Sequence, residues 1–125
     1  MDKISLRTAL NIPSINKKDD EVFQNEVIRP IIKLQHLLII AFFKEYLAAT
    51  KIDFPAIKKE LKLKAIKDSL KKVPAVNAFY KGLISGLFTA EEFKTYLENK
   101  LSYNKRIIQI IEQRLIDSIE EICKK

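Results

Sequence analysis

Apolar residues recur at every third or fourth position along almost the whole chain, and this helical spacing constrains the fold more than any other feature. No stretch of four or more residues alternates cleanly between apolar and polar side chains, as a half-buried strand would. Glycine occurs twice in 125 residues, too rarely for many tight β-turns or for a phosphate-cradling loop. We therefore expect an all-α fold, a single-domain irregular bundle of five or six helices.

Capping residues, prolines and apolar spacing divide the chain into elements. We expect residues 1–18 to be an extended segment packed on the domain, and residues 19–125 to form the helical bundle. Pro30 and Pro74 either kink continuous helices or separate shorter ones. The expected helices run from Asp19 or Asp20 to about Ala49, from Asp53 to about Lys72, from Pro74 to about Leu87, from the Thr89–Glu92 capping box onward, and from about Ser102 to about Cys123.

Residues 22–47 are expected to form the central helix of the bundle. At 100° per residue the polar side chains fall mainly on one narrow stripe, and the other faces are almost entirely apolar. The run from Leu37 to Phe43 is apolar throughout, but its seven residues are far fewer than the roughly 20 needed to span a membrane. We therefore expect a buried helix in which Phe42→Ala leaves a large cavity.

Composition excludes several functional classes. A single cysteine cannot close an internal disulfide, which favours a reducing compartment. A single histidine excludes sites that need two imidazoles, including zinc helices with an HExxH motif. The first residues contain no apolar run of signal-peptide length. We expect a soluble cytoplasmic protein that has no metal or other cofactor and no contact with a membrane.

The polar stripe of the central helix is the first candidate for an anion site. Arg29, Lys33 and His36 stand at positions i, i+4 and i+7, so their side chains can converge on a phosphate or carboxylate. The structural alternative is favoured: Glu26 pairs with Arg29, Lys33 extends to water, and His36 lies at the edge of the core. Catalysis by His36 would also need a partner and a substrate cleft, and the sequence shows neither.

A second anion candidate lies at the expected start of the last helix. Asn104 and Arg106 flank Lys105 there, where free backbone donors and cationic side chains suit an anion. Alternatively, Asn104 helps to cap the helix and the two cations are solvated.

A lysine-rich segment carries most of the formal net charge of +7. Such a segment can neutralise phosphates of a nucleic acid without reading sequence. However, its lysines scatter around a helical axis and no aromatic residue lies between them, so a solvated helix face is the favoured interpretation. The nucleic-acid candidates are Lys58, Lys59, Lys62, Lys64, Lys67, Lys71 and Lys72.

Two further motifs favour structural roles. Gly82 and Gly86 have the small-xxx-small spacing that lets helices approach closely, and we expect Gly82 to contact a neighbouring helix and Gly86 to end its own. Cys123 lies near the negative end of the last helix, which disfavours a thiolate, so we expect it to be inert.

Several short sequence words resemble a family of small, uncharacterised, all-helical bacterial proteins. The words are FQNEVIRPIIKLQ from Phe23, GLFTAEEF from Gly86, NKRII from Asn104 and QRL from Gln113, and together they cover roughly residues 20–116. Some members are called glyoxalase, but glyoxalase I enzymes are β-rich and bind metal through His and Glu, so that activity is not carried over. The resemblance directs attention to Asn25, Arg29, Lys33, Gln35, Asn104 and Arg106.

The C-terminal helix has an apolar surface wider than a single coiled-coil seam, formed by Ile107, Ile108, Ile110, Ile111, Leu115, Ile116, Ile119 and Ile122. We expect this surface to make a homodimer by packing; alternatively, residues 1–18 cover it. The sequence thus indicates a small binding or assembly module without catalytic machinery, whose protein partner is unknown. The alternatives are a basic accessory protein bound to nucleic acid through Lys58–Lys72 and, third, an unrecognised enzyme with an anion site near Arg29.

Overall fold

The computed structural model describes residues 20–124, so the expectations for residues 1–18 and for Asp19 lie outside the described residues. Within that range all regular structure is helical, which confirms the all-α prediction. Counting 20–34 as one continuous helix and leaving out the three-residue turn η2, this range has seven helices rather than the expected five or six, and six of them have at least seven residues. The elements are α2 (Asp20–Phe23), η1 (Gln24–Ile28), α3 (Arg29–Leu34), α4 (His36–Ala49), η2 (Phe54–Ala56), α5 (Lys59–Lys72), α6 (Pro74–Ser85), α7 (Ala90–Glu98), α8 (Lys100–Asp117) and α9 (Ile119–Cys123).

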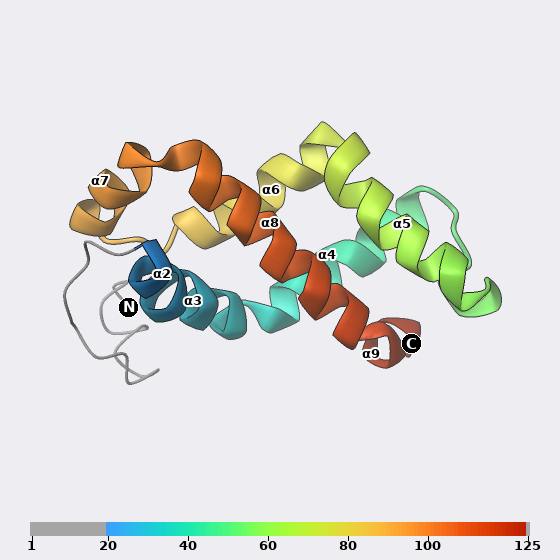
Figure 1. Cartoon of the computed structure of the whole chain (residues 1–125). Coiled ribbons are helices and arrows are strands. Elements are labelled where there is room, and N and C mark those ends of the chain that lie inside the picture. The colour runs from blue at the N-terminus through green and yellow to red at the C-terminus, as the bar shows by residue number, and fades with distance from the viewer. Residues whose placement is uncertain (1–19, 125) are drawn as a thin grey trace.

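The central helix is α8, which differs from the expectation that residues 22–47 would hold this place. In Figure 1, α8 runs diagonally across the molecule from α7 to α9. It packs against η1, α3, α4, α5, α6, α7 and α9. Tyr103, Ile107, Ile111 and Leu115 form its buried face, with a spacing of four residues. Because α8 touches almost every other helix, it positions the side chains on its opposite, polar face.

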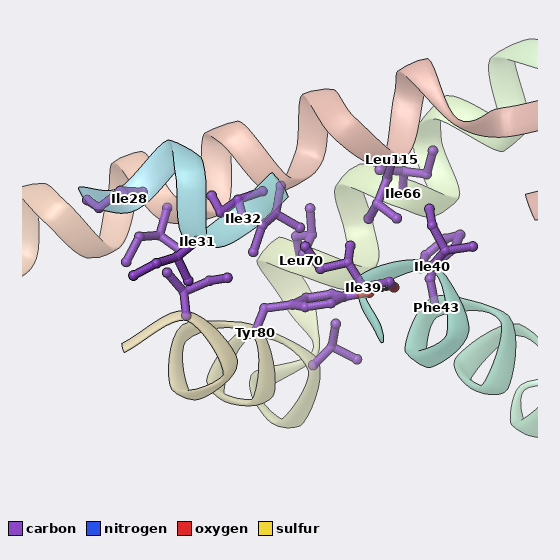
Figure 2. Close-up of a cluster of buried hydrophobic side chains, with 14 of the residues drawn as sticks. Ile28, Ile31, Ile32, Ile39, Ile40, Phe43, Ile66, Leu70, Tyr80 and Leu115 are labelled. Atoms are coloured by element: carbon purple, nitrogen blue, oxygen red, sulfur yellow. Dashed lines mark hydrogen bonds between the residues drawn. The ribbon is translucent and has the colours of Figure 1, made fainter. Parts of the chain in front are cut away.

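The core joins side chains from helices far apart in the sequence (Figure 2). Tyr80 of α6 is buried among them, and its hydroxyl donates to the carbonyl of Ile39 at 2.9 Å. Phe43 of α4 packs edge-on against Phe54 of η2, with ring centroids 5.8 Å apart. The labelled core residues are Ile28, Ile31, Ile32, Ile39, Ile40, Phe43, Ile66, Leu70, Tyr80 and Leu115.

Pro30 does not separate two helices. The chain is helical from residue 20 to residue 34, and Pro30 is the second residue of α3. The five residues before α3 form η1, a π-helical turn. A proline ring clashes with the carbonyl four residues earlier in a regular α-helix, and a π-turn widens the backbone at that point. The helix therefore continues through Pro30.

The helix expected across residues 22–47 ends at Gln35 and restarts at His36. The φ/ψ angles of Gln35, −91° and 11°, leave the helical region, and its side-chain amide donates to the carbonyl of Leu83 in α6 at 3.3 Å. The break exposes the next turn, where Leu37 is 75 % and Leu38 53 % exposed. The run expected to be buried is therefore buried on one side only, through Ile39, Ile40 and Phe43. No described helix has the length and apolar character that crossing a membrane requires.

The helix expected from Asp53 starts later. Asp53 makes no capping hydrogen bond, and Phe54–Ala56 form a separate 3₁₀ turn whose Phe54 is buried. Ile57 is extended, and α5 begins at Lys59 and ends at Lys72 as expected. Burial of Phe54 fixes the turn in place, and this tertiary contact leaves no local sign in the sequence.

The expected caps differ in outcome. The Thr89 capping box is confirmed: Glu92 N donates to Thr89 Oγ1 at 3.2 Å, and Thr89 N donates to Glu92 Oε1 at 2.9 Å. The last helix starts at Lys100 rather than Ser102 and is interrupted at Ser118. At Gly82, residues 20–124 do not make the expected close helix contact, because a Cβ placed there would meet none of them within 4 Å.

Candidate anion-binding cleft

A hollow of about 550 Å³ opens beside the polar face of α8. The chain contains four arginines, and three of them line this hollow: Arg29 from α3, and Arg106 and Arg114 from α8. Arg7, the fourth, lies outside the described residues. The other lining residues are Gln109, Ile110, Glu112, Gln113, Asp117 and Ser118.

Helical spacing brings these side chains together. Arg106, Gln109, Gln113 and Asp117 follow one another at intervals of three or four residues, which places them on one side of α8. The opposite side, with Ile107, Ile111 and Leu115, is buried in the core. Because packing fixes that apolar side, α8 cannot turn its polar side away from the hollow.

Neutral amides orient Arg29 and Arg106. Arg106 Nε donates to Gln24 Oε1 at 3.1 Å, and Arg106 Nη1 donates to Gln109 Oε1 at 3.2 Å. Arg29 Nε donates to Asn25 Oδ1 at 3.2 Å. The expected pair between Glu26 and Arg29 does not form, and one carboxylate oxygen of Glu26 is buried without a hydrogen-bond partner. Among the described residues, therefore, amides hold both arginines in place and no carboxylate pairs with them.

Arg114 is held by His36, which lies at the start of α4. Arg114 Nη1 and His36 Nδ1 are 3.1 Å apart, and His36 Nε2 and Glu121 Oε1 are 3.0 Å apart. A guanidinium can only donate, so Nδ1 accepts and the imidazole carries its proton on Nε2, which donates to Glu121. Both nitrogens of His36 are thus engaged, and the residue positions Arg114 rather than acting as a free base.

Within residues 20–124, none of the three cleft arginines forms an ion pair with a carboxylate. In addition, Arg114 Nε is buried and has no hydrogen-bond partner among the described residues. Guanidinium groups bind carboxylates and phosphates through several parallel N–H donors. Three oriented guanidiniums around one hollow, with which no described carboxylate pairs, are therefore suited to hold an anion.

The five anion candidates proposed from sequence have different positions in the structure. Arg29 and Arg106 line the hollow, and His36 reaches it through Arg114. Lys33 is exposed and is not a lining residue. Asn104 accepts a hydrogen bond from the Tyr96 hydroxyl and does not line the hollow either.

Sequence reasoning missed Arg114, Gln109 and Gln113. All three line the hollow together with Arg106. Their spacing from Arg106, at three, seven and eight residues, is a signal that a helical projection of α8 would have revealed. The contribution of Arg29 across the hollow could not be found in this way, because it depends on the packing of α3 against α8.

The lysine-rich segment is separate from the hollow, which no residue of α5 lines. Lys62 donates to the Ile57 carbonyl at 2.9 Å, and Lys64 lies 2.6 Å and Lys72 3.7 Å from carboxylate oxygens of Asp68. The hydrogen bond from Lys64 is the main reason that the pKa of Asp68 lies below its usual value. Binding of nucleic acid through Lys58–Lys72 stays a prediction.

In the part of the chain that the structure describes, no group of three or more His, Cys, Asp or Glu side chains could hold a metal ion. Cys123 is half-buried at the end of α9 and packs against the core.

The apolar C-terminal surface is largely covered by the chain itself. Ile107, Ile111, Leu115 and Ile122 are buried, and Ile108, Ile110, Ile116 and Ile119 are partly buried against the core. The homodimer through this surface stays a prediction.

No family model matches the chain, and no curated protein or solved structure matches it. The resemblance to small bacterial proteins therefore stays an expectation.

Proposed function

We propose that this chain is a small helical binding module that holds an anionic ligand in the cleft formed by Arg29, Arg106 and Arg114. The observation that carries the proposal is the state of these arginines: amides and an imidazole orient them, and no described carboxylate neutralises them. A ligand phosphate or carboxylate would supply the missing negative charge.

The contacts of His36 favour binding over catalysis in this cleft. His36 is the single histidine of the chain, and both of its ring nitrogens already have partners. A general base needs a free nitrogen within reach of the substrate. The proposal therefore assigns no reaction to this cleft.

Inorganic phosphate is the first probe. At ten times its dissociation constant, a ligand that binds only the folded state adds about 1.4 kcal/mol to the free energy of unfolding. We expect phosphate, titrated at constant ionic strength, to raise the melting temperature and to shift the amide NMR signals of residues around the cleft. Arg106→Gln should weaken binding about tenfold, because a charge-assisted hydrogen-bond donor is lost.

Lys94→Gln on α7 is the matched control, because it removes the same charge from an exposed residue outside the cleft. Phosphate also stabilises proteins by exclusion from their surface, and that effect would be the same in both variants. Equal phosphate responses of the wild-type chain, Arg106→Gln and Lys94→Gln would refute the proposed function.

A further inference from the structure

The hollow that holds the three arginines also contains carboxylates. Glu112 and Asp117 both line it. Asp117 Oδ1 accepts a hydrogen bond from Gln113 Nε2 at 2.9 Å, so an amide orients this carboxylate as amides orient two of the arginines. Charges of both signs therefore face one hollow without pairing with each other within the described residues.

Arg114 and Asp117 both line the hollow but do not form an ion pair with each other. The two residues are three positions apart on α8, a spacing at which opposite charges commonly pair. Instead, Arg114 Nη1 points to His36, at 3.1 Å, and Asp117 is engaged by Gln113. Contacts with two neutral side chains thus keep the opposite charges apart.

The charges are also ordered along the hollow. Arg106 and Asp117 are eleven positions apart, about 16 Å along the helix axis, whereas Arg114 and Asp117 are three positions apart, about 4.5 Å along that axis. Arg106 lies in the first half of α8, whereas Asp117 is its last residue. The C-terminal end of a helix carries a partial negative charge, which adds to that of Asp117 and favours a cation. Along α8 the lining charges alternate in sign, from Arg106 through Glu112 and Arg114 to Asp117, so the guanidinium of Arg114 and the carboxylate of Asp117 serve the same end of the hollow.

We propose that the cleft selects small zwitterions: molecules that carry a phosphate or carboxylate at one end and an ammonium group at the other. The anion lies between the guanidiniums, and the ammonium lies at the end of α8 beside Asp117. A purely anionic polymer fits less well, because the carboxylates of Glu112 and Asp117 would repel it. This inference rests on the proposed function and adds to it the class of ligand.

Two probes that differ by one ammonium group test the inference: ethyl phosphate and 2-aminoethyl phosphate. Titrations at pH 8 and constant ionic strength compare them, since both phosphates are then dianions. We expect the wild-type chain to bind 2-aminoethyl phosphate about fivefold more tightly, the size of effect that an exposed ion pair supplies. Asp117→Asn should remove this preference and leave the affinity for ethyl phosphate unchanged or higher.

Glu98→Gln on α7 is the matched control, because Glu98 is exposed and does not line the hollow. It should retain the full preference. If the wild-type chain binds both probes equally, or if Asp117→Asn retains the preference, the zwitterion inference is wrong while the anion-binding proposal stands. If neither probe nor inorganic phosphate binds, both fail. Should Asp117→Asn not fold, the ratio measured on the wild-type chain decides alone.

Discussion

At the scale of single residues, the cleft arginines differ in how firmly their surroundings hold them. Arg106 makes two side-chain hydrogen bonds, through Nε and Nη1. Arg114 is held through Nη1 alone, but its Nε is buried. Arg29 is exposed and makes one side-chain bond. We therefore expect Arg106 and Arg114 to be preorganised for a ligand, and Arg29 to adjust to it.

Tyr80 gives a prediction at this scale. Its buried hydroxyl donates to the Ile39 carbonyl at 2.9 Å, and burial raises the pKa of the phenol above its usual value. Tyr80→Phe should lower the free energy of unfolding by about 1 kcal/mol near pH 7, because that hydrogen bond is lost.

The difference in free energy of unfolding between the wild-type chain and Tyr80→Phe should depend on pH with a definite sign. Above about pH 10 a tyrosine ionises in the unfolded chain, while buried Tyr80 stays protonated, so rising pH favours unfolding. Each further pH unit then lowers the free energy of unfolding of the wild-type chain by about 1.4 kcal/mol. Tyr80→Phe does not have this loss, because phenylalanine does not ionise. Urea unfolding between pH 7 and 11 should show the difference narrowing and then changing sign. A constant difference across this range would contradict the assignment.

At the scale of elements, the residue whose backbone conformation favours glycine is a lysine, and a glycine lies inside a helix where its conformation does not require one. Lys51, which follows α4, has a positive φ of 58°, a conformation that favours glycine. The backbone N–H of Lys51 donates a hydrogen bond to the Ala48 carbonyl, and the backbone N–H of Ile52 donates one to the Leu47 carbonyl. These two hydrogen bonds are the pattern of a Schellman motif. Gly82, in contrast, lies inside α6 with open space where its Cβ would be.

Alanine substitutions of Gly82 inside α6 and of Gly86 at its C-terminal end test whether each position requires glycine. Gly82→Ala should raise the free energy of unfolding by about 0.5–1 kcal/mol, because alanine stabilises a helix interior and meets no neighbour at this position. Gly86→Ala should lower it, since a Cβ there would lie 2.9 Å from the Gly82 carbonyl oxygen. Chemical denaturation of both variants measures the two changes in the free energy of unfolding, which should have opposite signs. A destabilised Gly82→Ala would show that this residue packs against something that residues 20–124 do not include.

At the scale of the whole molecule, the core and the cleft depend on the same helix. The buried side of α8 contacts the other helices, and its polar side supplies most of the cleft. Core substitutions that displace α8 should therefore also weaken binding in the cleft.

The two neighbouring phenylalanines of α4 separate core packing from surface packing. Phe43 is buried, whereas Phe42 is partly buried and stacks on the exposed ring of Phe79, with centroids 3.9 Å apart. We expect Phe43→Ala to lower the free energy of unfolding by roughly 3–5 kcal/mol and Phe42→Ala to lower it by clearly less. Urea unfolding of both variants measures this order. Equal losses would mean that the exposed side of α4 is covered by a part of the molecule outside residues 20–124.

The sequence by itself determined the local structure. Apolar spacing and the absence of alternating segments predicted helices, and the Thr89 capping box and the end of α5 at Lys72 were found where expected. These features depend on side chains within four residues of each other, so a local pattern contains them. The same holds for Arg29 and Arg106, which were recognised as anion candidates from their nearest neighbours.

Tertiary structure decided the rest, because the contacts concerned join residues far apart in the chain. Gln35 ends a helix where its amide reaches Leu83, and Phe54 fixes a turn by its burial against Phe43. Packing of α3 and α4 on α8 brings Arg29 to the cleft and His36 to Arg114, 78 residues away in the sequence. Neighbours within four residues cannot report such contacts, which form only when the burial of apolar side chains brings the helices together.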